Sequence, residues 1–156
     1  MGDLPDSTLV ATPLGHIRRI VCASPGYLAA HGQPQRPQDV AGHALVVSAA
    51  DGRSDRWRFV EGEGTVDVEI APRLTVSTSE AAISAALAGW GLTRVMSYQV
   101  AAELQRGELT RLLQPYEAKP IPVWLVNTEG RRAAAKLRRF IAFAAEHLRG
   151  HPALVA

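Results

Sequence analysis

Two apolar periodicities alternate along this chain. Every second residue is apolar in segments 56–60 and 65–70, a pattern typical of antiparallel strands with one solvated face. Segments 25–31, 78–89, 98–106 and 131–149 instead have the composition and spacing of helices. Shorter apolar runs bounded by turn residues predict further strands at 8–11, 17–22, 43–48, 73–77, 92–96, 109–113 and 121–127. Because strands and helices interleave, the predicted fold class is α/β.

The last predicted strand and the last predicted helix both carry apolar residues that need to be covered. Segment 121–127, IPVWLVN, is nearly all apolar, so it is predicted to be buried on both faces. The final helix carries an apolar stripe with basic residues opposite, and the stripe comprises Ala134, Leu137, Ile141, Ala144 and Leu148, flanked by Phe140. Residues 1–15 offer too little chain to cover both surfaces. We therefore expect these surfaces to pair with another chain, which makes the protein a homo-oligomer.

Composition narrows the class of protein. The 156 residues are 47% hydrophobic and 21% charged, enough for one ordinary domain or two small lobes with a buried core. The net charge of +2 is too small for a dedicated nucleic-acid surface. No apolar run is long enough to span a bilayer, and the first residues lack the basic and apolar regions of a signal peptide. A cytoplasmic protein without membrane contact is expected.

The join between strand 73–77 and helix 78–89 is the first candidate site. It reads Ser77-Thr78-Ser79-Glu80, three hydroxyls and a carboxylate. One interpretation is a capping box between Ser77 and Glu80, worth roughly 1 kcal/mol. The other is a ligand site, because a helix N-terminus at the carboxyl end of a strand offers free N–H groups and a positive dipole end. Both interpretations stay open, and Ser77, Thr78 and Ser79 are the candidate ligand-binding residues.

A second stretch could line the same ligand site. Ser48 ends strand 43–48 and Ala49 follows it, and the two form either another wall of a ligand site or a plain turn.

The other candidate residues are assigned structural roles. Trp57 and Phe59 are assigned to the core. Cys22, the single cysteine, lies in an apolar strand with no histidine close in sequence, which indicates a buried, inert thiol. The histidines lack metal-ligand spacing and the serines lack an identifiable base, so no catalytic residue, metal or cofactor is expected.

Several short motifs occur in a characteristic order. They are the segment Ala23-Ser24-Pro25-Gly26-Tyr27-Leu28, the segment Arg36-Pro37-Gln38-Asp39-Val40, the segment Ala86-Leu87-Ala88-Gly89-Trp90-Gly91-Leu92, and the strand Pro122-Val123-Trp124-Leu125-Val126 before the final helix. In this order, and over nearly the whole chain, the sequence resembles the effector-binding domain of LysR-type transcriptional regulators.

The resemblance implies a fold, a function and partners. The expected fold is a periplasmic-binding-protein-like type II architecture, with a complete second lobe at 16–118. The first lobe is partial, with a remnant and crossover at 1–15 and a return at 119–150, before a tail at 151–156. The implied function is to bind a small-molecule effector in the cleft and so control a DNA-bound oligomer. Domains of this family pair side by side, so the resemblance implies that the expected homo-oligomer is a symmetric dimer. DNA would be contacted only through an N-terminal helix-turn-helix that this chain lacks. The alternative is a free-standing solute-binding module unrelated to transcription, and an enzyme ranks third.

Overall fold

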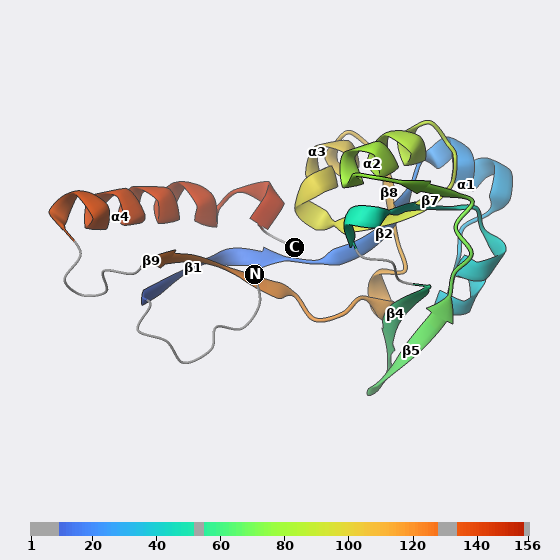
Figure 1. Ribbon diagram of the computed structural model, residues 1–156, viewed down its shortest axis with the longest axis horizontal. Helices are drawn as coiled ribbons and strands as arrows, with labels where there is room; N and C mark the ends of the chain where they lie inside the picture. Colours follow the sequence, from blue (N-terminus) through green and yellow to red (C-terminus); the bar gives the residue numbers. More distant parts are fainter. Residues whose placement is uncertain (1–9, 52–54, 128–133, 155–156) are drawn as a thin grey trace. The chain divides into compact units, whose positions relative to one another are not determined.

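The computed structural model describes residues 10–51, 55–127 and 134–154 (Figure 1). By their contacts, the residues group into two compact units. The larger unit comprises Arg19–Ala118, and the smaller unit combines Met1–Arg18 with Lys119–Ala156.

A mixed five-stranded sheet forms the centre of the larger unit. Its order is β6-β3-β7-β2-β8. The strands are β2 (Arg19–Ala23), β3 (Leu45–Ser48), β6 (Leu74–Val76), β7 (Leu92–Met96) and β8 (Thr110–Leu112). Strands β6, β3 and β7 are parallel, whereas β2 runs antiparallel to both of its neighbours, β7 and β8.

One face of this sheet is covered by helices. These are α2 (Ser79–Leu87) and α3 (Ala101–Gln105), the second preceded by the 3-10 turn η3 (Ser97–Val100). Ile20 and Cys22 of β2 point to this side, because alternate residues of a strand face opposite ways. The buried cluster beneath the helices comprises Ile20, Cys22, Ile83, Ala86, Val95, Val100 and Leu109.

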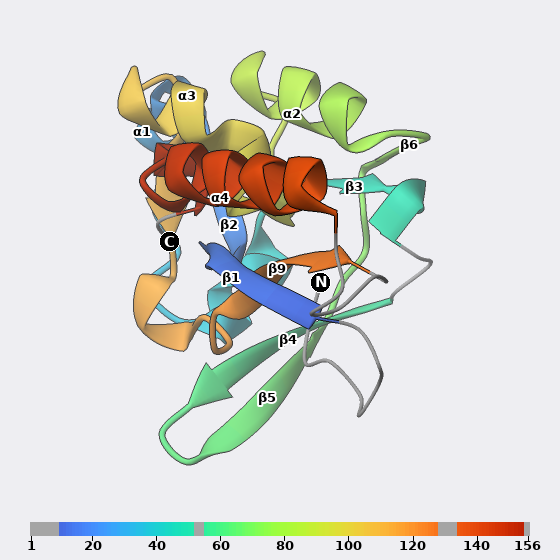
Figure 2. The ribbon, with the colours of Figure 1, turned by 90° about the vertical axis from the view of Figure 1, so that its left-hand side faces the viewer.

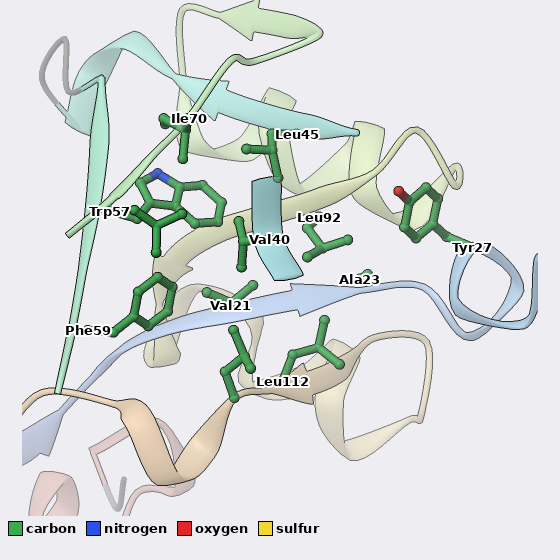
Figure 3. Packing of buried hydrophobic residues seen from close by; sticks show 12 residues of the cluster. Val21, Ala23, Tyr27, Val40, Leu45, Trp57, Phe59, Ile70, Leu92 and Leu112 are labelled. Carbon is green, nitrogen blue, oxygen red and sulfur yellow. The ribbon is translucent and has the colours of Figure 1, made fainter. Parts of the chain in front are cut away.

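The opposite face is covered by a hairpin and by short helical segments (Figure 1). Strands β4 (Arg56–Glu61) and β5 (Gly64–Glu69) form the hairpin, and α1 (Pro25–His31) and η1 (Pro37–Gly42) complete the cover. The cluster on this side includes Val21, Val40, Leu45, Trp57, Phe59, Leu92 and Leu112 (Figure 3). Trp57 and Phe59 are 3% and 4% exposed, which confirms that they belong to the core.

Local signals account for the start of α1. The Ser24 hydroxyl accepts a hydrogen bond from the Tyr27 amide at 3.4 Å, and Pro25 occupies the first helical position. The antiparallel strands predicted at 56–60 and 65–70 form the hairpin β4–β5. The strand predicted at 73–77 corresponds to β6, which does not extend this hairpin and instead pairs in parallel with β3.

The smaller unit is built on a two-stranded antiparallel sheet. Strand β1 (Val10–Ile17) pairs with β9 (Ile121–Asn127), and α4 (Ala135–Arg149) lies against β1 (Figure 2). The 3-10 turn η6 (Pro152–Leu154) follows α4 and also contacts β1. The sequence predicts a strand at 8–11, of which residues 8 and 9 lie outside the described part, and β1 extends further than predicted.

The prediction that 121–127 is buried on both faces is wrong for the described residues. Six residues of β9 are half-buried and Val126 is 40% exposed, because the described part of the chain offers β9 a single partner strand. The stripe on α4 is partly covered: Leu137, Ile141 and Ala144 are half-buried, and Ala145 is buried. Phe140 and Phe143 are 62% and 59% exposed.

Candidate functional site

The two candidate stretches lie side by side at one edge of the sheet. Strands β3 and β6 are parallel neighbours, and Ser48 stands opposite Val76 in their register. Both strands therefore end at the same edge. The 3-10 turn η2 (Ala49–Asp51) begins directly after one strand, and the Ser77–Ser79 join begins directly after the other. This strand-end site lies where ligands bind in open α/β sheets, outside the carboxyl ends of parallel strands.

The helix cap is Thr78, so the predicted capping box between Ser77 and Glu80 is wrong. Thr78 has extended backbone angles (φ −129°, ψ 157°), and its hydroxyl accepts a hydrogen bond from the Ala81 amide at 3.2 Å. With Thr78 as the cap, the third helical position is Ala81, and Glu80 occupies the second. The exposed Ser77 is then the residue before the cap and makes no capping bond.

The hydroxyls of the site differ in what they can still bind. Ser77 and Thr78 are exposed, and Ser79 is 8% exposed. Neither the Ser77 nor the Ser79 hydroxyl has a hydrogen-bond partner among the described residues. Ser48 is 2% exposed, and its oxygen accepts a hydrogen bond from the Ala50 amide at 3.1 Å, so it also stabilises its own turn. Ala49 is exposed beside it.

Backbone groups add to these hydroxyls. The amides of Ser79 and Glu80 lie in the first turn of α2, where an α-helix provides no acceptor for them. Together with the positive end of the helix dipole, they favour a ligand that presents an oxygen acceptor. The Glu80 carboxylate in the same turn opposes a multiply charged anion. The arrangement therefore suits a neutral or singly charged small molecule.

The arrangement offers no evident group for bond-breaking chemistry. Among the residues that the structure describes, no three His, Cys, Asp or Glu side chains come together as a metal site. Cys22 is buried, and burial, with a smaller effect of the Glu103 charge, raises the pKa of its thiol to about 12. The thiol is therefore protonated at neutral pH and is a poor nucleophile.

Sequence reasoning missed a second group of polar residues in the larger unit. Arg19, Arg58 and Arg94 line a pocket on the sheet face that the hairpin covers. Their positions in the sequence are far apart, and only the alternation of Arg19 and Val21 along β2 places one of them on that face.

The sequence of residues 1–149 matches the family model of the LysR substrate binding domain. The chain belongs to the LysR substrate-binding domain family. Within the described residues, no helix has the length and apolar character to cross a membrane.

Relatives of this LysR family member are transcriptional regulators. The HTH-type regulator YhjC of Escherichia coli K12 is 31% identical over 151 residues, which is 90% of this chain and 48% of that protein. The HTH-type regulator CrgA of Neisseria meningitidis serogroup B is 32% identical over 148 residues, which is 94% of this chain and 49% of that protein. The chain thus spans about half the length of these curated relatives.

Solved LysR regulatory domains share the fold. The AphB regulatory domain of Vibrio vulnificus matches with a TM-score of 0.81 at 25% identity, covering 93% of this chain and 72% of that domain. The CrgA regulatory domain of N. meningitidis matches with a TM-score of 0.74 at 32% identity, covering 94% and 72%. The periplasmic-binding-protein-like type II fold is confirmed. The assignment as a LysR effector-binding domain is confirmed over that of a free-standing solute-binding module.

Proposed function

We propose that this chain senses a small-molecule effector through the strand-end site formed by Ser48, Ala49, Ser77, Thr78 and Ser79. The observation that carries the proposal is the register of β3 and β6, which brings the two stretches together. The Ser77 and Ser79 hydroxyls support it, because neither has a hydrogen-bond partner among the described residues and each can donate to a ligand oxygen. In this reading, residues 16–118 form the second lobe, and residues 1–15 and 119–150 belong to the first.

The mechanism that fits this arrangement is a population shift. A ligand held at the ends of β3 and β6 favours one conformation of the regulator only as far as it binds that conformation more tightly. DNA is contacted through a helix-turn-helix outside this chain, and the regulator works in the cytoplasm. The ligand class that suits the donors is a small neutral or singly charged molecule with a carbonyl, carboxylate or hydroxyl oxygen.

The test starts from a ligand screen and then uses paired variants. Small organic acids, amides and polyols are screened by thermal shift, and each stabilising compound is titrated calorimetrically into the chain and into Ser77→Ala/Ser79→Ala. Neither hydroxyl has a protein partner in the described structure, so the double variant should keep its stability. Its affinity should fall by roughly 1–3 kcal/mol, as for hydrogen bonds lost in a ligand site.

A matched control separates this effect from a general change in α2. Ser84 is also a serine on α2, exposed and five residues beyond Ser79, and Ser84→Ala should bind the ligand as the parent chain does. Unchanged affinity of Ser77→Ala/Ser79→Ala for every hit would exclude these hydroxyls from the site and leave the join as a helix start only.

We also propose that the smaller unit mediates self-association into a symmetric dimer. Phe140 and Phe143 are more than half exposed on α4, and Val126 is 40% exposed on β9. Apolar surface left in water costs about 25 cal/mol per Å², and such patches commonly pair with another chain. Light scattering coupled to size exclusion should give a dimer, and Phe140→Glu/Phe143→Glu should weaken it. A monomer across a hundredfold range of concentration would contradict the proposal.

A further inference from the structure

A second pocket opens on the hairpin-covered face of the larger unit. Val21 of β2 stands between Arg94 of β7 and Leu112 of β8 in the two antiparallel registers, so these three side chains share one face. Arg19 precedes Val21 by two residues and points to the same side. All four residues line a cavity of about 50 Å³, and residues of β4 and of the segment after β8 complete its lining.

The floor of this pocket is apolar. It consists of Val21, Phe59, Leu112 and Leu113, all at most 6% exposed. Figure 3 shows Phe59 reaching from β4 toward Val21, with Leu112 beside them. Leu113 is held at φ 55°, the one positive φ outside glycine in the described residues. Such backbone conformations are costly for a branched side chain and are concentrated at functional sites.

Guanidinium groups form the rim, and two of them are held in place by their neighbours. Arg58 donates to Asp67 through Nε at 2.8 Å and Nη2 at 2.9 Å, which leaves three of its five N–H groups for another acceptor. The Arg94 guanidinium lies 5.1 Å from the centroid of the Trp57 ring, a cation–π contact. Arg19 is half-buried, and no described residue gives its guanidinium a hydrogen bond or an ion pair.

The charges at the rim do not cancel. Glu117 also lines the pocket, but its carboxylate is 6% exposed and is bound by Arg111 at 2.7 and 2.5 Å. Asp67 is likewise matched by Arg58. Three arginines but a single carboxylate, that of Glu117, line the pocket, so its lining carries a net positive charge.

We propose that this pocket binds a short-chain monocarboxylate. A volume of about 50 Å³ holds about three to five water-sized groups, which is a tail of about three carbons. The tail would lie on the apolar floor, and the carboxylate would accept hydrogen bonds from Arg19, Arg94 and the unused N–H groups of Arg58. An inorganic anion would leave the apolar floor wet, and a neutral molecule would leave Arg19 without a counter-charge. The pocket shares no residue with the strand-end site.

The test is an amide-resolved NMR titration of the 156-residue chain with sodium butyrate at constant ionic strength. Shifts should saturate and centre on Arg19, Val21, Phe59 and Arg94. Each methylene buried on the floor should strengthen binding about fourfold, so butyrate should bind about fifteenfold more tightly than acetate. Butyramide, which has the same tail without the charge, should cause no saturable shift at the same concentrations. Equal affinities for acetate, butyrate and sulfate would overturn the proposal.

Two arginine variants separate this site from general attraction of anions. Arg19→Gln should weaken butyrate about tenfold or more, as expected when a charge-assisted hydrogen bond is lost. Arg73→Gln removes the same charge from an exposed residue of the larger unit that does not line the pocket, and it should bind butyrate normally. Equal effects of the two variants would refute the site. The wild-type series decides the question even if Arg19→Gln does not fold.

Discussion

Replacing Thr78 should destabilise the protein, whereas replacing Ser77 should not. The Thr78 hydroxyl accepts one hydrogen bond, from the Ala81 amide at 3.2 Å, and thereby satisfies one free donor of the first turn of α2. Loss of such a cap typically costs about 1 kcal/mol. Thr78 is exposed, so water can partly replace its oxygen, and we expect Thr78→Ala to stay near this value. Ser77 makes no such bond, so Ser77→Ala should stay within about 0.5 kcal/mol of the parent.

Urea unfolding followed by circular dichroism measures this difference. With a slope of about 2 kcal/mol per M, a loss of about 1 kcal/mol moves the midpoint by about 0.5 M, which is readily resolved. Thr78→Ser keeps the accepting oxygen and should restore the parent midpoint. If Ser77→Ala shifted the midpoint as much as Thr78→Ala, the assignment of the cap to Thr78 would be refuted and the box predicted from sequence would be restored.

Three further outcomes are expected. Gly91→Ala should cost about 3 kcal/mol or more in the free energy of unfolding, since φ is 153° and a Cβ there would overlap the Ala44 carbonyl. Gly26→Ala, whose Cβ would meet nothing, is its control. Cys22 should resist a thiol reagent at pH 8 until the protein is denatured, because its pKa is about 12, and rapid modification of the native protein would contradict that burial. With a net charge of +2, the chain alone should show only weak binding to DNA at physiological salt, and a nanomolar, sequence-selective complex would be the opposite result.

Element positions could be predicted because their signals are local. Helix α1 and strands β7 and β9 fall where the sequence predicts them, at 25–31, 92–96 and 121–127. A serine followed by proline starts the first, and glycine or proline bounds the others. The alternation of apolar and polar residues within β4 and β5 likewise predicts a hairpin. The strand that pairs with β6 could not be predicted from such local signals. The apolar residues of β6 are compatible with either β5 or β3 as the neighbouring strand.

The sequence could only partly predict the roles of the residues at the join between β6 and α2. Ser77, Thr78 and Ser79 are all competent caps, and the capping-box spacing to Glu80 favours the first of them. The structure selects the second, because β6 ends at Val76 and the chain stays extended through Thr78 before it turns into α2. The sequence could therefore predict which residues meet at the join but not the role of each. Shifting the cap by one residue leaves Ser77 and Ser79 free for a ligand, which strengthens the binding interpretation.

The arginine pocket marks the limit of sequence reasoning. Arg19 and Arg94 are 75 positions apart in the chain, and they share a face only because Val21 pairs with Arg94 in one register. A slip of one residue between β2 and β7 would turn Arg94 to the helix-covered face, where Ile20 and Val95 now pack. Burial of the apolar residues on both faces therefore determines the register, and the register determines which charges meet. The arginine cluster is thus a consequence of core packing. Val95→Asp would place a charge among the buried residues beneath the helices, so we expect it to unfold the larger unit and separate the arginines.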